Sequence, residues 1–175
     1  MTKFISSKSA ILILTIIALA VIRLLPHPPN FTPIAAMALF GGAYFSSRWM
    51  AFLVPLGAMF LSDAILGFHG ATMIAVYCSF ILVVALGLRL KKNISLASVP
   101  IMALVSAILF YLITNFAVWV GSPIYTQDLS GLVLCYTAAI PFFHYSVLGN
   151  LVFTTILFGG FFLASLKLPI LSPER

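Results

Sequence analysis

The sequence predicts an all-α integral membrane protein built as a six-helix bundle in a single domain, residues 1–175. Composition is the first reason: 63% of the residues are hydrophobic, 7% are charged, and the mean hydropathy is +1.21. Soluble domains normally carry about a quarter charged residues. The second reason is that apolar runs recur at roughly the 20 residues that a helix needs to cross a bilayer.

Six apolar spans are expected, with a short outer half-helix before the last one. The spans cover about residues 9–25, 33–45, 49–66, 71–90, 97–120 and 145–166. The half-helix covers about residues 131–143, because Pro141 should break it from the final span. An alternative for the first span is a secretory signal peptide, in which Lys3 and Lys8 precede the apolar run and Ala18–Ala20 forms the cleavage site.

The distribution of Lys and Arg predicts that both termini are cytoplasmic. Basic residues in short loops accumulate on the cytoplasmic side of a membrane. With this orientation one side receives Lys3, Lys8, Arg48, Arg89, Lys91, Lys92, Lys167 and Arg175. Arg23 alone is left near the other side. The net charge of +6 is thereby assigned to orientation, and no nucleic acid partner is expected because no basic run exceeds Arg89–Lys92.

Polar side chains converge on the outer end of this bundle. They are Arg23, His27, Asn30, Asp63, His69, Tyr125, Asp128 and His144. Polar groups in or beside the bilayer are costly, so their clustering indicates a water-filled pocket that opens outward. Tyr111, Asn115 and Trp119 form one stripe on the fifth span and are candidates for its lining. Alternatively, Asn115 bonds a neighbouring helix and Trp119 belongs to the interfacial aromatic belt.

Cys78 has two interpretations. The fourth span runs inward, which puts this residue roughly 10 Å below the outer surface, beside Tyr77. It is either a small hydrophobe of the core or a thiolate that faces the pocket and binds a soft or borderline transition metal. A disulfide with Cys135 would abolish the thiolate role. Neither cysteine has the spacing of a zinc site.

His27, His69 and Asp63 are candidates for an acid/base set or a metal site. They lie on separate turns, without the helical spacing that would fix their geometry. Loop histidines more commonly bond water or backbone carbonyls. An intramembrane enzyme that uses Asp63 with one of these histidines is therefore a rival interpretation.

Four motifs then carry a resemblance to a known family. They are "RLLPHPPNFTPIAAMALFGGAYF" (Arg23–Phe45), "FLSDAILGFH" (Phe60–His69), "ITNFAVW" (Ile113–Trp119) and "CYTAAIPFFHYSVLGNL" (Cys135–Leu151). In this order they resemble a bacterial membrane family related to the substrate-binding S-components of energy-coupling-factor vitamin transporters. The similarity covers roughly residues 23–159.

Cys78, in "AVYCSF", resembles the cysteine of the BtuM branch, the solitary cobalamin transporters. The resemblance implies uptake of cobalamin across the bacterial inner membrane, with Cys78 as axial cobalt ligand and catalytic residue in the loss of cyanide from cyanocobalamin. Further ligand contacts are proposed from position and motif: Tyr77, His27, Asp63, His69, Asn115, Tyr111 and Tyr125. The rival with the same fold is a binder of another small vitamin or precursor, in which Cys78 is structural.

Two further features bear on how transport is driven. S-components dock their transmembrane partner through small residues at i and i+4 of the first span, whereas Ala10 and Ala18 here have Leu14 and Ile22 four positions on. This departure fits a solitary transporter without an energy-coupling module. No nucleotide-binding P-loop motif occurs in the sequence. The polar segment Gly121–Gly131 is the expected lid over the pocket.

Overall fold

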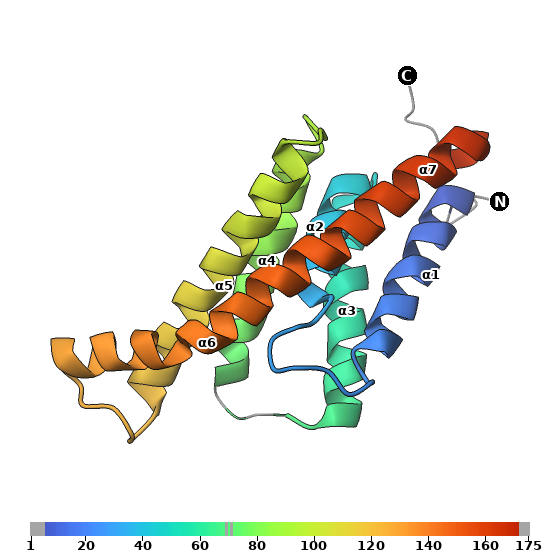
Figure 1. Cartoon of the computed structure of the whole chain (residues 1–175). Coiled ribbons are helices and arrows are strands. Elements are labelled where there is room, and N and C mark those ends of the chain that lie inside the picture. Colours follow the sequence, from blue (N-terminus) through green and yellow to red (C-terminus); the bar gives the residue numbers. More distant parts are fainter. Residues whose placement is uncertain (1–5, 69, 71, 172–175) are drawn as a thin grey trace.

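The computed structural model describes residues 6–68, 70 and 72–171, and the predicted all-helical fold is confirmed for these residues. The helices are α1 (Ser7–Ile22), α2 (Ile34–Tyr44), α3 (Arg48–Leu66), α4 (Thr72–Leu90), α5 (Ser98–Gly121), α6 (Leu129–Thr154) and α7 (Gly160–Lys167). A π-helical turn, Thr155–Gly159, joins α6 to α7, and a 3-10 turn, Pro169–Leu171, follows. The helices pack side by side as one bundle (Figure 1).

Four helical segments within the described residues are long and apolar enough to cross a membrane. They are α3, α4, α5 and the continuous stretch Leu129–Lys167. The remaining apolar helices, α1 and α2, are shorter, with 16 and 11 residues. The chain is therefore a membrane protein by the length and composition of its helices.

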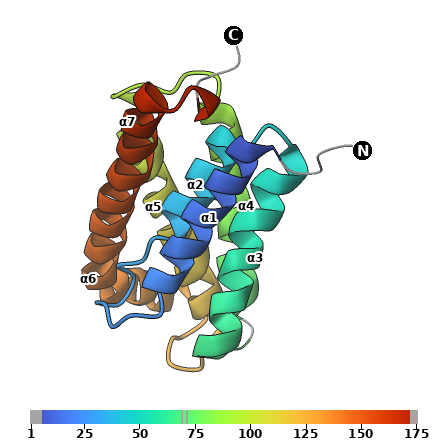
Figure 2. The ribbon, with the colours of Figure 1, turned by 90° about the vertical axis from the view of Figure 1, so that its right-hand side faces the viewer.

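The short helix α2 lies at the centre of the bundle. Ten of its residues, from Ile34 to Ala43, are buried, and it contacts α1, α3, α4, α5 and α6. Figure 2 shows it behind α1 and between α3 and α5. A helix that is apolar on every face gains most when it is surrounded by other helices. Alanine and glycine make up much of it, which lets those helices approach closely.

The closest approach is between α2 and α4, at Gly42 and Gly87. A β-carbon added at Gly42 would lie 2.8 Å from the Cα of Gly87 and would also collide with the Val84 carbonyl oxygen. A β-carbon at Gly87 would meet the backbone of Leu39. Close backbone contact through small residues is a main source of helix association in lipid, because burial of apolar area provides little driving force there.

The two ends of the bundle differ in charge. α1 begins and α7 ends at the same end, which is the upper end in Figure 1. The basic residues at the helix termini and loops of that end are Lys8, Arg48, Arg89, Lys91, Lys92 and Lys167. The connections 23–33 and 122–128 lie at the opposite end (Figure 1). The predicted separation of charge is thus present in the fold, and Lys3 and Arg175 lie outside the described residues.

The expected break at Pro141 is wrong. α6 is one helix from Leu129 to Thr154 with Pro141 inside it, so no separate half-helix over residues 131–143 exists and no span begins at 145. Figure 1 shows the first turns of α6 lying at an angle to the rest of the helix. Proline removes one helical hydrogen bond and kinks a helix. In an apolar surrounding the other backbone groups still need their partners, so the helix bends and continues.

Substitution of the crossing glycines should destabilise the bundle. Gly42→Ala or Gly87→Ala should lower the free energy of unfolding by about 1–3 kcal/mol, because the added methyl group overpacks a backbone contact. Unfolding of the purified protein in mixed micelles, followed by circular dichroism, measures this change. Gly57→Ala is the matched control, since a β-carbon there meets nothing within 4 Å. Equal stability of all three variants would contradict the close crossing.

Candidate functional site: a buried charge cluster beside a cavity

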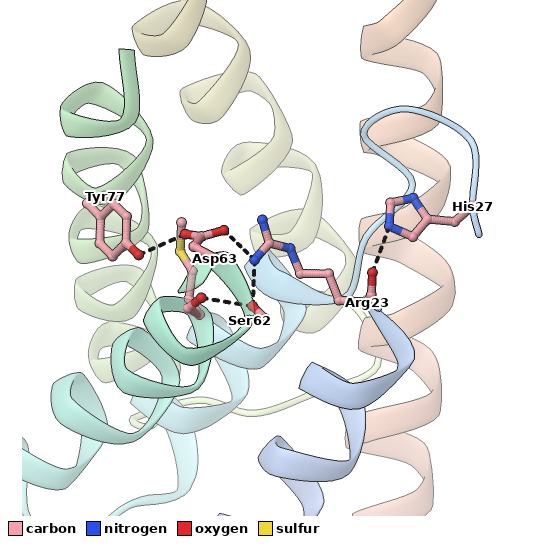
Figure 3. A network of polar contacts seen from close by, with 6 residues as sticks. Arg23, His27, Ser62, Asp63 and Tyr77 are labelled. Atoms are coloured by element: carbon pink, nitrogen blue, oxygen red, sulfur yellow. Dashed lines mark hydrogen bonds and ion pairs between the residues drawn. The ribbon is translucent and has the colours of Figure 1, made fainter. Parts of the chain in front are cut away.

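A cluster of four polar side chains joins three helices at the end opposite the basic residues. Arg23 at the end of α1 forms an ion pair with Asp63 of α3, with 2.6 Å between Nη1 and Oδ1. The same Nη1 donates to Ser62 Oγ at 2.5 Å, and the Tyr77 hydroxyl of α4 donates to Asp63 Oδ2 at 2.7 Å. Figure 3 shows these side chains pointing toward one another from separate helices.

This cluster is buried inside the bundle. The side chain of Asp63 is 1% exposed and that of Arg23 is 14% exposed. Removing one partner of a buried pair leaves an uncompensated charge, which costs far more than the intact pair contributes. Among the described residues, Asp63 is held by Arg23 and Tyr77, and no contact with His27 is present. The predicted acid/base pair of Asp63 with His27 gains no support from this arrangement.

His27 lies in the connection that follows α1. Its side chain is exposed, with Nδ1 at 3.0 Å from the Pro28 carbonyl oxygen and Nε2 at 3.2 Å from the Arg23 carbonyl oxygen. The ring thus lies over the end of α1, beside the charge cluster (Figure 3). His69, its other predicted partner, lies outside the described residues.

Beside this cluster is a cavity of about 240 Å³ between α4, α5, α6 and the connection 23–33. Its lining consists of Asn30, Thr72, Val76, Phe110, Tyr111, Thr114, Asn115, Val118, Ala139, Phe142, Phe143 and Ser146. Small-molecule sites are typically concave and apolar, with a few convergent polar groups. This cavity has that composition, and none of the described residues in its lining carries a charge.

Three polar groups of the lining donate to carbonyl oxygens of their own helices, and the Tyr111 hydroxyl donates to the Tyr136 carbonyl oxygen of α6 at 2.5 Å. Thr114 donates to the Phe110 carbonyl oxygen at 2.7 Å, and Ser146 donates to that of Phe142 at 3.3 Å. The Asn115 amide nitrogen donates to the Tyr111 carbonyl oxygen at 2.8 Å. A hydroxyl or amide that donates in this way keeps lone pairs on its oxygen. These three groups therefore present acceptors to the cavity, next to its aromatic rings.

Only part of the stripe predicted on the fifth span lines the cavity. Tyr111 and Asn115 line the cavity. Trp119 does not, because its indole nitrogen donates to the Thr126 carbonyl oxygen at 2.9 Å. Tyr125 is half-buried in the connection 122–128 and is also outside the lining. The predicted set therefore contributes two residues to the cavity, both from α5.

Cys78 lies away from this cavity. Its thiol is free and its side chain is exposed, on the same face of α4 as the exposed Ile74 and Leu82. Val76, two positions earlier, lines the cavity. Two positions along an α-helix are a rotation of about 200°, so the two side chains face nearly opposite ways. Cobalt ligation by Cys78 stays a prediction, which this placement does not favour.

The other cysteine is also free. Cys135 is buried, and its thiol lies 3.5 Å from the Asn115 carbonyl oxygen. The alternative of a Cys78–Cys135 disulfide is therefore not realised in the structure. Within the described part of the chain, no group of three His, Cys, Asp or Glu side chains is placed to hold a metal ion.

Several residues that line the cavity were not predicted from the sequence. Thr114, Phe142, Phe143 and Ser146 lie in apolar spans, where a lone hydroxyl or aromatic ring is common. A usable signal does exist on α5, because Thr114 and Val118 lie three and seven positions after Tyr111 and so extend its face. No comparable pattern links α5 to α6, since that contact depends on tertiary packing.

The expected lid is tethered to the helices beside it. The Gln127 amide nitrogen donates to the Trp119 carbonyl oxygen at 2.7 Å. Asp128 caps α6: its Oδ1 accepts from the Gly131 amide and from the hydroxyls of Ser130 and Thr126, each at 2.8 Å. These hydrogen bonds, with the Gly131 amide contributing most, lower the pKa of Asp128 to about 2.

The chain also matches a known protein family. Residues 3–171 match DUF6580, a family of unknown function. The chain belongs to this family. No curated protein matches the sequence, and no solved structure matches it.

Breaking the charge cluster should destabilise the fold. Arg23→Ala should lower the free energy of unfolding by about 3–5 kcal/mol, because Asp63 would be left buried without its partner. Tyr77→Phe should cost about 1.5–3 kcal/mol, the usual range for a hydrogen bond to a charged group. Detergent-based unfolding monitored by tryptophan fluorescence provides the measurement. The double variant Arg23→Met with Asp63→Leu should be more stable than Arg23→Ala, and the opposite order would refute the interpretation.

The Asp128 cap should make stability depend on acid pH. Its pKa is about 2 in the folded protein against an ordinary 3.8, so its contribution is complete above pH 3.8 and is lost as pH falls toward 2. Asparagine also caps helices well but does not titrate in this range. The melting temperature of wild type should therefore fall relative to Asp128→Asn between pH 4 and pH 2. If the melting temperatures of wild type and Asp128→Asn change equally over that pH interval, Asp128 does not stabilise the helix as a charged cap.

Proposed function

We propose that the protein is a membrane-embedded binding component for the uptake of a small, uncharged organic solute. The cavity of about 240 Å³ between α4, α5 and α6 carries the proposal. It lies at the end of the bundle away from the basic residues and combines aromatic rings with convergent polar groups. These are the features of small-molecule sites between helices.

The proposed setting is a bacterial inner membrane with both termini in the cytoplasm. The basic residues at one end of the bundle favour that orientation by the positive-inside tendency. All six apolar segments up to α6 are assigned to the bilayer, although α2 is only about 16 Å long at 1.5 Å per residue. Because α2 is surrounded by protein, it does not need to reach either surface. The cavity would then open toward the periplasm.

The lining suggests the chemistry of the solute. Oxygen lone pairs of Thr114, Asn115 and Ser146 favour a ligand with hydrogen-bond donors. The rings of Phe110 and Phe143 favour a flat or apolar body. The described residues of the lining carry no charge, which disfavours an ionised ligand, whose desolvation they would not compensate. A small vitamin or vitamin precursor meets these requirements.

The resemblance to S-components supports the same class of function, without a docking partner. The outward face of α1 carries the large side chains Leu14, Ile17 and Val21, which are 66%, 46% and 56% exposed. Small residues would be needed there for a close helix contact with an energy-coupling module. We therefore propose that the protein acts as a solitary uptake component.

Cobalamin is the more specific candidate that the resemblance implies. The outer cavity, at about 240 Å³, is smaller than the usual range of about 300–1,000 Å³ for small-molecule sites, whereas a corrinoid is a large ligand. Cys78 also faces away from the cavity. Cobalamin binding would therefore require α4 to turn or the outer end to open, so we rank a smaller solute first and keep cobalamin as the alternative.

A ligand panel tests the proposal. The purified protein is heated with thiamine, riboflavin, biotin, pantothenate, nicotinamide, pyridoxine or cyanocobalamin, and the melting temperature is measured. One of the uncharged small compounds, riboflavin, nicotinamide or pyridoxine, should raise it, whereas thiamine, biotin and pantothenate, which are ionised at neutral pH, should not. Thr114→Val should weaken binding of that compound about 5–10-fold through loss of one hydrogen bond. Thr137→Val is the matched control, because Thr137 also donates to a carbonyl of its own helix but is exposed outside the cavity.

The outcomes of this panel separate the candidates. A shift with cyanocobalamin, together with a change in its absorbance that Cys78→Ala abolishes, would establish the cobalamin alternative. Equal loss of binding in Thr114→Val and Thr137→Val would place the ligand elsewhere than the cavity.

A further inference from the structure

A second cavity lies at the basic end of the bundle. It measures about 430 Å³ and is formed by the start of α5, the end of α6, the π-helical turn and the loop that precedes α5. Its lining consists of Tyr44, Ile94, Ser95, Leu96, Val99, Pro100, Leu151, Thr154, Thr155, Phe158, Gly159 and Phe162. π-Helical turns within long helices are frequent at functional sites. The proposed binding function assigns no role to this cavity.

Thr154 is the unusual residue in its lining. The side chain is 2% exposed, and its hydroxyl has no hydrogen-bond partner among the described residues. Other threonines in these helices donate to a carbonyl four positions earlier, as Thr155 does to Leu151 and Thr15 does to Ile11. An unpaired buried hydroxyl costs about 1–3 kcal/mol, which a polar occupant of the cavity would offset. The unpaired hydroxyl of Thr154 therefore favours an occupant with a polar group, in a cavity whose other lining residues are mostly apolar.

A third, small cavity continues the outer cavity toward this one. Its volume of about 30 Å³ has room for a water molecule. Asn30, Phe110 and Ser146 line both it and the outer cavity, so the two adjoin. It adds the polar side chains of Thr32 and Asn150 and the apolar ones of Ala35, Phe80 and Ala107.

One helical turn separates the small cavity from the inner one. Ser146, Asn150 and Thr154 lie at i, i+4 and i+8 on α6, and are 8%, 5% and 2% exposed. Asn150 lines the small cavity and Thr154 the inner one, about 6 Å apart along the helix axis. Between them the Asn150 amide nitrogen donates to the Ala103 carbonyl oxygen of α5 at 3.3 Å. This hydrogen bond joins α5 and α6 between the two cavities.

We infer that the seam between α5 and α6 is a path for small polar solutes, closed in this structure at Asn150, with the inner cavity as its vestibule on the basic side. The inference rests on the proposed binding function, because it gives the captured solute a route through the protein. Asn150 is the gate residue of this path. Ala107 lines the small cavity with Asn150, and Ala103 accepts its hydrogen bond, so movement of the Asn150 side chain would open this point of the seam.

Cysteine accessibility tests this path without knowledge of the solute. In a Cys78→Ala, Cys135→Ala background, single cysteines replace Ser146 or Thr154, and vesicles of both orientations are treated with the membrane-impermeant reagent 2-(trimethylammonium)ethyl methanethiosulfonate. Ser146→Cys should react from the side on which Ile124→Cys reacts. Thr154→Cys should react from the side on which Lys92→Cys reacts. Ile124 and Lys92 are exposed references at the two ends.

The gate is tested by a second substitution. Asn150→Ala, added to Thr154→Cys, should make this cysteine reactive from the Ile124 side also, with a rate at least 10-fold above that of the parent. Ile156→Cys is the matched control on the outer face of the same helical stretch, where the side chain is 57% exposed and lines none of the three cavities. This cysteine should stay unreactive toward the impermeant reagent from both sides, because its side chain faces the lipid. Melting temperatures of all variants establish that they are folded.

Two results would overturn the path. If Thr154→Cys reacts only with the apolar reagent N-ethylmaleimide, the inner cavity holds lipid. If Asn150→Ala leaves the reactivity of Thr154→Cys one-sided, Asn150 is not the gate. Either result leaves the outer cavity intact as a binding site. If instead no compound of the ligand panel raises the melting temperature, the binding function is contradicted, while the reactivity of these cysteines is unaffected.

Discussion

The ion pair between Arg23 and Asp63 constrains the end of the bundle at which the outer cavity lies. Both groups are withdrawn from water, so each needs the other to offset its desolvation. The pair fixes the end of α1 against α3, and the Tyr77 hydroxyl adds α4. The connection that follows Arg23 is thereby set in place, and its Phe31 packs on Phe153 of α6 with 5.5 Å between ring centroids. Asn30 reaches the cavity because both ends of its connection are held.

At the centre of the bundle the constraint is steric. α2 is buried on nearly every side, and Gly42 and Gly87 bring its backbone against that of α4. Larger side chains would push the outer helices apart. The cavities lie where this close packing is relaxed, along α5 and α6. There, Phe and Tyr rings alternate with Ser, Thr and Asn, and the three cavities follow one another from the outer end toward the basic end.

Most of the helices could be predicted from the sequence, because hydropathy over about 20 residues is a local property. Five expected spans agree with α1 to α5 to within a few residues. The sixth was placed wrongly, since the prediction treated Pro141 as a break. Whether proline ends a helix or only bends it depends on the surroundings of the freed carbonyl, which the local sequence does not encode. Among candidate site residues, Tyr111 and Asn115 were found because they share a helix face, whereas Asp63 was expected to face a pocket and pairs with Arg23 instead.

The sequence by itself determined that this chain is an all-helical membrane protein with most of its basic residues at one end, because both properties follow from composition and from the positions of charges between apolar runs. Only the tertiary structure decided which polar groups meet. Cys78 and Val76 are two positions apart and face opposite ways, whereas Asn115 and Ser146, 31 positions apart in the numbering, line one cavity. Helix rotation and helix contacts set these relations, and they arise when the whole bundle packs.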